Sequence, residues 1–125
     1  MADVTYADWL DKLWNGDLDR LEDLAAEVVS ADFTGTWPGR PGFVTGPGEL
    51  AAVIREGRTM FDELRFEVEV GPLADGDLVA ARWVGRGRYQ GEPVEFRGHD
   101  LLRRDGGRFV EYWVIAEDPV QRPTA

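Results

Sequence analysis

The chain has 125 residues, and 24 acidic against 14 basic side chains give it a formal net charge of −10 at pH 7. One compact domain typically contains about 100–150 residues, so we expect residues 1–125 to form a single domain with a core over about residues 6–118. The acidic surplus repels phosphate backbones and anionic lipid, which argues against nucleic-acid and membrane partners.

The chain has no cysteine and one histidine, His99, which excludes disulfides and cysteine nucleophiles and argues against Ser-His and multi-histidine metal sites. We therefore expect no metal and no cofactor. The apolar stretches are far shorter than the ~18 residues of a membrane span. Three aspartates within Met1–Asp11 do not fit a signal peptide. These features predict a cytoplasmic protein.

The N-terminal half carries helical patterns. Apolar residues recur at helical spacing over Tyr6–Trp14, and Asn15-Gly16 ends this helix. A second helix begins at Asp17. Its apolar stripe comprises Leu18, Leu21, Leu24, Ala25 and Val28. Val29–Trp37 is predicted to be a short strand, and the Pro- and Gly-rich segment Pro38–Gly48 a loop.

A third helix is predicted over Gly46–Phe61. Thr45 or Gly46 can cap it, Pro47 lies near its first position, and Glu49 falls in its first turn.

From Leu64 onward, apolar residues recur at every second position, as in strands with one buried face. The first strand ends at Gly71-Pro72, and its buried face comprises Phe66, Val68 and Val70. The apolar face of a second strand comprises Val79, Ala81, Trp83, Gly85, Gly87 and Tyr89. The inward face of a third comprises Phe96, Gly98, Asp100 and Leu102. With a last strand over Phe109–Ala116, this order predicts an α+β fold whose curved antiparallel or mixed sheet wraps around N-terminal helices.

Asp100 is the residue that does not fit its pattern, because it lies on the apolar side of its strand, opposite the side that carries His99. Burial of an unpaired carboxylate is costly, so this group must find donors, stay protonated or border a water-filled cavity. Gly98, two residues earlier on the same face, leaves room for such a cavity. Asp100 is therefore either a structural carboxyl held by backbone N–H groups or a tyrosine, or a candidate catalytic residue.

The hairpin that follows supplies a neighbour for Asp100. If Asp105-Gly106-Gly107 is a three-residue loop with Gly107 at positive φ, Arg104 faces Arg108 and Asp100 lies opposite Tyr112. A two-residue loop would instead bring Trp113 opposite Asp100. In either register, a polar-tipped aromatic side chain can donate to the carboxyl group.

The order of elements resembles a known family. Trp14-Asn15-Gly16-Asp17, the helix at Gly46–Phe61, the strand Phe96–Arg103 and the hairpin to Trp113 are similar to those of the SnoaL-like polyketide cyclases, within the nuclear transport factor 2-like superfamily. The resemblance extends from about Tyr6 to Asp118. It implies a cone-shaped α+β barrel around a deep apolar pocket, and a homodimer formed through the outer face of the sheet.

Matching positions imply roles for single residues. Asp100 matches the strand carboxyl that acts as acid or base in the cyclases, Tyr112 matches a pocket-lining position, and Tyr89 stands where the cyclases often have a histidine. The related ketosteroid isomerases use a tyrosine on the first helix and a carboxylate base, and this chain has Trp9 and Trp37 at those positions. The epoxide hydrolases need an arginine where this chain has Gly98. Both of those reactions are therefore disfavoured.

The predicted function is acid/base, aldol-type ring closure of a small hydrophobic polyketide-like molecule. Tryptophans are mostly core residues, but they can also line an apolar pocket. The candidate substrate-binding residues are Trp9, Trp37, Trp83, Tyr89, Phe96, Leu102 and Tyr112. The alternative is a non-catalytic domain that binds a hydrophobic small molecule or serves dimerisation.

Overall fold

The computed structural model describes residues 3–117, so the expected core boundary at residue 118 lies outside the described part of the chain. The helical elements are α1 (Tyr6–Asp8), η1 (Trp9–Trp14), η2 (Leu18–Arg20), α2 (Leu21–Val28) and α3 (Gly46–Thr59). The strands are β1 (Val29–Thr36), β2 (Val44–Thr45), β3 (Asp62–Asp75), β4 (Leu78–Tyr89), β5 (Glu92–Asp105) and β6 (Arg108–Ala116).

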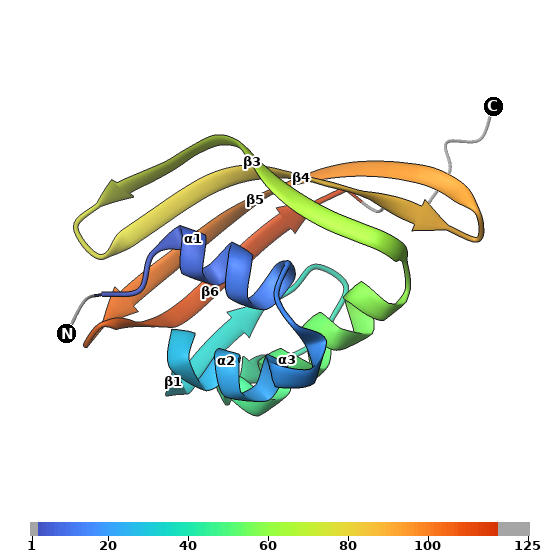
Figure 1. The fold of residues 1–125 in the computed structure, drawn as a ribbon. Helices are drawn as coiled ribbons and strands as arrows, with labels where there is room; N and C mark the ends of the chain where they lie inside the picture. The colour runs from blue at the N-terminus through green and yellow to red at the C-terminus, as the bar shows by residue number, and fades with distance from the viewer. Residues whose placement is uncertain (1–2, 118–125) are drawn as a thin grey trace.

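The strands form one mixed sheet in the order β2-β1-β6-β5-β4-β3, in which only the β1–β6 pair is parallel. Figure 1 shows the long strands β3, β4 and β5 curving over α1, with α2 and α3 lying on the same side of the sheet. The α+β prediction, with three N-terminal helices against a curved mixed sheet, is therefore confirmed.

The first helix is held at both ends. Thr5 and Asp8 form a capping box, because the Thr5 hydroxyl accepts the Asp8 N–H while the Asp8 carboxylate accepts the Thr5 N–H at 2.8 Å. The second part of the helix, η1, is a π-helical segment. At the other end, the Asn15 side chain donates to the Phe66 carbonyl at 2.8 Å and accepts the Phe66 N–H at 2.9 Å. Asn15 thus both ends the helix and ties it to β3.

The segment predicted as a loop contains a short strand. Val44 and Thr45 pair with Gly35 and Thr34 as β2, and α3 begins directly after them with Thr45 at the N-cap position. The Val44 side chain is buried, although β2 is an edge strand of the sheet. A two-residue strand leaves no periodic signal in a stretch this rich in proline and glycine, so the sequence pattern missed it.

Strand β3 corrects another expectation. It continues through Gly71-Pro72 to Asp75, and of the three residues expected on its buried face only Phe66 is buried. Val68 is paired with inward-facing Trp83, whereas Val70 is paired with Arg82, so the face changes between them. An extra residue in a bulge reverses which side the following residues face, which breaks simple alternation. β3 is also an edge strand, and its far end extends beyond the helical layer in Figure 1.

Both expected registers of the last hairpin are wrong. The turn has two residues, Gly106 and Gly107, with φ of 62° and 87°, so Asp105 pairs with Arg108. A bulge beyond Arg104 then shifts the pairing, and Asp100 lies opposite Val114. The positive φ expected at Gly107 is present, but turn length and bulge together set the register, and the sequence pattern shows neither reliably.

The core lies between the helices and the inner side of the sheet. Its fully buried members include Trp9 and Leu13 from the first helix, Phe33 from β1, and Phe109 from β6. In the described part of the chain, no helix combines the length and the apolar character that a bilayer span requires.

Candidate functional site

Asp100 is buried on the inner side of the sheet. It lies in β5, its residue is only 3 % exposed, and it is the one buried charged residue among residues 3–117. Its neighbour His99 lies on the outer side, where its ring contacts Arg82. The alternation of β5 therefore places Asp100 as the sequence pattern predicts.

Three neutral donors hold the carboxyl group. The Tyr112 hydroxyl and the Trp83 indole N–H both donate to Oδ1, at 2.6 and 2.9 Å, and the Tyr6 hydroxyl donates to Oδ2 at 2.7 Å. A carboxylate offers about four acceptor positions, so these bonds leave one position on Oδ2 open.

Gly98 positions one of these donors. It lies directly across from Trp83 in the β4–β5 pair, and a Cβ at Gly98 would overlap the Trp83 indole ring. The expectation that Gly98 leaves an open cavity is therefore wrong, because the indole fills that space. The ring lies over the glycine, and its N–H donates to the carboxyl group two residues further along β5.

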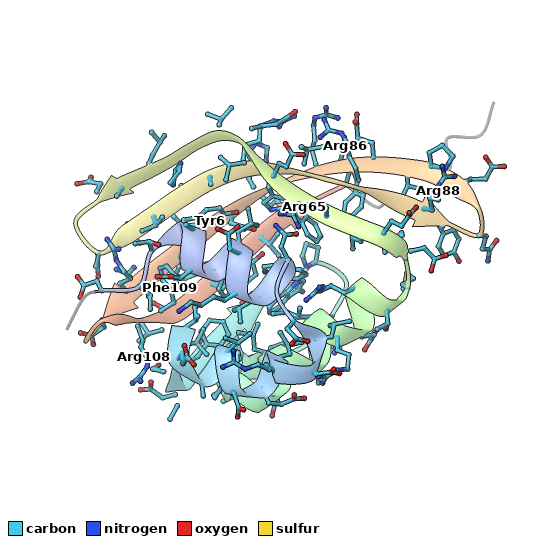
Figure 2. The ribbon with its side chains drawn as sticks, viewed as in Figure 1. Tyr6, Arg65, Arg86, Arg88, Arg108 and Phe109 are labelled. Atoms are coloured by element: carbon cyan, nitrogen blue, oxygen red, sulfur yellow. The ribbon has the colours of Figure 1, made fainter. Side chains whose placement is uncertain are left out.

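The other two donors come from β6 and from the first helix. Tyr112 lies opposite Leu102, diagonal to Asp100, so its hydroxyl reaches the carboxyl group although the two residues are not cross-strand partners. Tyr6 is the first residue of α1 and lies between the two capping-box residues, Thr5 and Asp8. Figure 2 shows Tyr6 beneath the curved sheet, on the opposite side from Arg86.

Burial controls the protonation of this cluster. It raises the pKa of Asp100, and the hydrogen bonds from Tyr112, Tyr6 and Trp83 oppose that rise without cancelling it. Burial and the neighbouring carboxylate raise the pKa of Tyr6 and of Tyr112 well above the usual phenol value. Both phenols therefore keep their protons at neutral pH and remain donors, while Asp100 is the group that can exchange a proton.

The carboxyl group borders an apolar cavity of about 690 Å³. Its aromatic walls are Trp14, Trp37, Phe61, Phe66, Trp83, Phe96 and Tyr112. Its other apolar side chains are Leu10, Pro38, Met60, Leu64, Val114 and Ala116. Apolar walls with a few convergent polar groups are typical of small-molecule sites.

Four of the seven candidate substrate-binding residues line this cavity, namely Trp37, Trp83, Phe96 and Tyr112. The other three do not. Trp9 is fully buried behind Tyr112, with 4.6 Å between ring centroids, and its N–H has no partner among the described residues. Leu102 is fully buried in the core, and Tyr89 packs against the cavity residue Phe61 at 5.7 Å between ring centroids.

Sequence reasoning missed Tyr6 as a partner of Asp100. Tyr6 stands three residues before Trp9 and four before Leu10, on the apolar stripe of the first helix. A buried tyrosine hydroxyl needs a partner, and this was the available signal. The pattern could not name the partner, because 94 residues separate Tyr6 from Asp100.

Known proteins share the family and the fold of this chain. A family model described as a SnoaL-like domain matches residues 6–112. Among solved structures, IdmH from Streptomyces antibioticus, assigned as a candidate polyketide cyclase, is 26% identical, with a TM-score of 0.74 and coverage of 90% of this chain and 88% of that one. A loop-truncation variant of IdmH is 27% identical, with a TM-score of 0.76 and coverage of 90% and 89%.

A hypothetical protein from Catenulispora acidiphila, described as having a ketosteroid isomerase-like fold and crystallised with trimethylamine, has the same fold. It is 17% identical, with a TM-score of 0.75 and coverage of 92% of this chain and 86% of that one. No protein of curated function is similar enough in sequence to count as a match. The family match spans most of the chain, and we conclude that this protein belongs to the SnoaL-like domain family.

Proposed function

We propose that this protein closes a ring in a hydrophobic, polyketide-like molecule by an intramolecular aldol reaction, with Asp100 as its acid/base group. The observation that carries the proposal is a buried carboxyl of raised pKa that borders an apolar cavity of about 690 Å³. Family membership and 26% identity to the candidate cyclase IdmH support it.

The reaction needs one proton removed and one returned. The Asp100 carboxylate takes a proton from a carbon that lies between two carbonyl groups, and the electrons of that C–H bond form an enolate. The enolate carbon attacks a second carbonyl of the same molecule, forming a C–C bond and an alkoxide. Asp100 then returns its proton to the alkoxide. Atoms and charge balance, and no further reactant is needed.

The hydrogen bonds around Asp100 suit this exchange. Two donors converge on Oδ1, so the open acceptor position is on Oδ2, beside the single bond from Tyr6. Oδ2 is therefore the oxygen that takes the proton. Tyr112 lines the cavity, and its phenol can swing from Oδ1 to an enolate oxygen.

The cavity walls supply the remaining contribution. A folded chain held between aromatic rings brings the two reacting carbons together, and exclusion of water strengthens the polar contacts at Asp100. A substrate with an activated methylene supplies much of the driving force itself, so one carboxyl group is sufficient.

The test is Asp100→Asn. The Asn oxygen can accept from Trp83 and Tyr112 as the carboxylate does, and its amide group can donate to the Tyr6 hydroxyl, so we expect the variant to fold. We expect ring closure of linear aryl poly-β-ketones, followed by NMR, to fall about 10²–10⁴-fold. Asp105→Asn, an exposed aspartate at the end of the same strand, is the matched control and should keep its activity. Turnover retained in a folded Asp100→Asn variant would remove Asp100 from the mechanism.

A second candidate function, dimerisation, is favoured by the outer face of the sheet. Leu101 on β5 and Ile115 on β6 face outward, and the cross-strand pair of Leu73 and Ala80 lies on the same face. Leu73 is 67% exposed and Ile115 is 75% exposed. Light scattering tests this proposal. A dimer should have twice the chain mass of 14.0 kDa, and Ile115→Lys should return it to the monomer mass. A wild-type monomer at working concentrations would refute dimerisation.

A further inference from the structure

The charged groups at the cavity are all of one sign. Asp100 and Glu117 are its only ionisable lining residues other than Tyr112, and no lysine, arginine or histidine in the described range lines it. The arginines of the neighbouring strands lie elsewhere. Arg82, Arg86 and Arg97 are on the outer face, each paired with a glutamate there.

Among residues 3–117, Asp100 therefore has no cationic partner. Phenol and indole donors lower the energy of a carboxylate, but they do not cancel its charge. An ionised Asp100 beside apolar walls is consequently a site where a cation from outside would be stabilised strongly, since little water competes with it.

The walls next to this carboxyl are the faces and edges of aromatic rings. The rings of Trp37 and Tyr112 lie 4.9 Å apart and those of Trp83 and Phe96 5.7 Å apart, measured between centroids. A cation within about 6 Å of such a ring centroid is attracted by the negative face of the ring. An organic ammonium ion also carries methyl or methylene groups, which suit an apolar wall better than a hydrated metal ion does.

We propose that this cavity binds a hydrophobic ammonium ion, a quaternary or protonated tertiary amine that carries an aryl or alkyl group, in preference to neutral or anionic molecules of the same shape. The cation lies against the aromatic walls and faces Asp100, and Glu117 adds a second negative charge at the cavity lining. Binding of this kind does not depend on ring closure and goes beyond it. It also implies that the cavity discriminates against carboxylates and phosphates.

The test compares three phenols that differ in one para substituent, which is trimethylammonium, tert-butyl or sulfonate. These groups have nearly the same shape and carry positive, zero and negative charge. Dissociation constants are measured at neutral pH from the indole N–H resonances, which also report whether Trp37 and Trp83 are the residues affected. We expect the ammonium compound to bind about tenfold more tightly than the tert-butyl compound, and the sulfonate to bind weakest.

Two variants locate the source of the preference. Asp100→Asn should reduce the ratio of ammonium affinity to tert-butyl affinity about tenfold. Asp105→Asn removes the same charge from an exposed position and should leave this ratio unchanged. If Asp100→Asn fails to fold, Glu117→Gln should still reduce the ammonium affinity, because Glu117 is an exposed residue of the cavity lining.

The dissociation constants of the three phenols for the wild-type protein decide whether the cavity prefers a cation. A tert-butyl compound that binds as tightly as the ammonium compound would overturn it, as would indole shifts confined to residues outside the cavity. The ring-closure assay with neutral substrates decides the proposed function separately. Turnover without ammonium preference therefore refutes this inference alone, and ammonium preference without turnover refutes ring closure alone.

Discussion

The two faces of strand β5 treat their charged side chains in opposite ways. On the outer face, Glu69 and Glu95 accept hydrogen bonds from Arg82, Arg86 and Arg97, and these bonds lower the pKa of both glutamates. On the inner face, burial raises the pKa of Asp100, and its donors are all uncharged. The carboxyl groups on the outer face thus have charged partners, and the carboxyl group on the inner face has uncharged ones. Alternation along the strand causes this difference, because successive side chains point to water and to the core in turn.

The two faces differ in their capacity for proton exchange. The outer carboxylates are ionised and neutralised by partners, so they have no free capacity to exchange protons. Asp100 keeps an open acceptor position, has no counter-charge from residues 3–117, and borders a cavity. Ion pairs among exposed groups contribute little to stability, whereas an incompletely compensated buried carboxyl is expensive and is typical of functional sites.

Substitution of Gly98 should have the largest effect on the inner face. In Gly98→Ala the new methyl group overlaps the Trp83 indole, so we expect the free energy of unfolding to fall by about 1–3 kcal/mol. The indole N–H signal of Trp83 should also move, because the ring can no longer donate to Asp100 in the same geometry.

Urea unfolding measures the loss of stability for Gly98→Ala. The control is Gly57→Ala in α3, where an added Cβ meets nothing within 4 Å and the helix should gain about 0.5–1 kcal/mol. Equal stability of Gly98→Ala and wild type would show that the indole does not lie against the glycine.

Removal of one inner-face donor should have an effect of the same order as Gly98→Ala. Tyr112→Phe and Tyr6→Phe each leave the buried carboxyl one hydrogen bond short, which should destabilise the fold by about 1–3 kcal/mol. Tyr112→Phe should in addition impair ring closure, because Tyr112 lines the cavity, whereas Tyr6→Phe should act mainly on stability. Chemical denaturation and the ring-closure assay separate the two, and equal kinetic losses would contradict the distinction.

The pH dependence of stability should have opposite sign on the two faces. The folded pKa of Asp100 lies above its unfolded value, so its contribution to stability is present below the unfolded pKa and is lost as pH rises through the folded pKa. The folded pKa of Glu95 is lowered by Arg86 and Arg97, so its contribution is present above the unfolded pKa and is lost as pH falls through the folded one.

Unfolding free energies over about pH 3–8 reveal these signs when wild type is compared with Asp100→Asn and with Glu95→Gln. Wild type should lose stability relative to Asp100→Asn as the pH is raised, and relative to Glu95→Gln as it is lowered. Parallel slopes in the two comparisons would mean that burial does not raise the pKa of Asp100 while the arginines lower that of Glu95.

Substitution of an outer-face arginine should have the smallest effect. Arg86→Gln breaks exposed ion pairs with Glu67 and Glu95, and such pairs contribute at most about 1 kcal/mol. Thermal unfolding at low and at high salt checks this, since the small difference should shrink further in salt. A loss as large as that of Tyr112→Phe would place the stabilising polar network of this sheet on its outer face.

Much of the architecture could be predicted from the sequence. The helical stripe from Tyr6 to Trp14, the glycines at the β5–β6 turn, and the alternation that sends Asp100 inward and His99 outward are local patterns. Each depends on the geometry of neighbouring residues along the chain, so it can be read without knowing what lies across from it. Bulges are the exception, because one extra residue reverses the side of the sheet to which all following side chains point. This happens in β3 before Val70.

The composition of the site depended on contacts between distant parts of the chain. By itself the sequence determined that a carboxyl group at position 100 must be buried and must therefore have partners. Only the tertiary structure decided that these partners are Tyr6, Trp83 and Tyr112, that the Trp83 ring fills the space over Gly98, and that a cavity remains beside them. Secondary structure follows from short-range backbone geometry. The hydrogen-bond donors around Asp100 and the cavity beside it arise where separate elements pack together, and a local sequence pattern does not show which elements will pack.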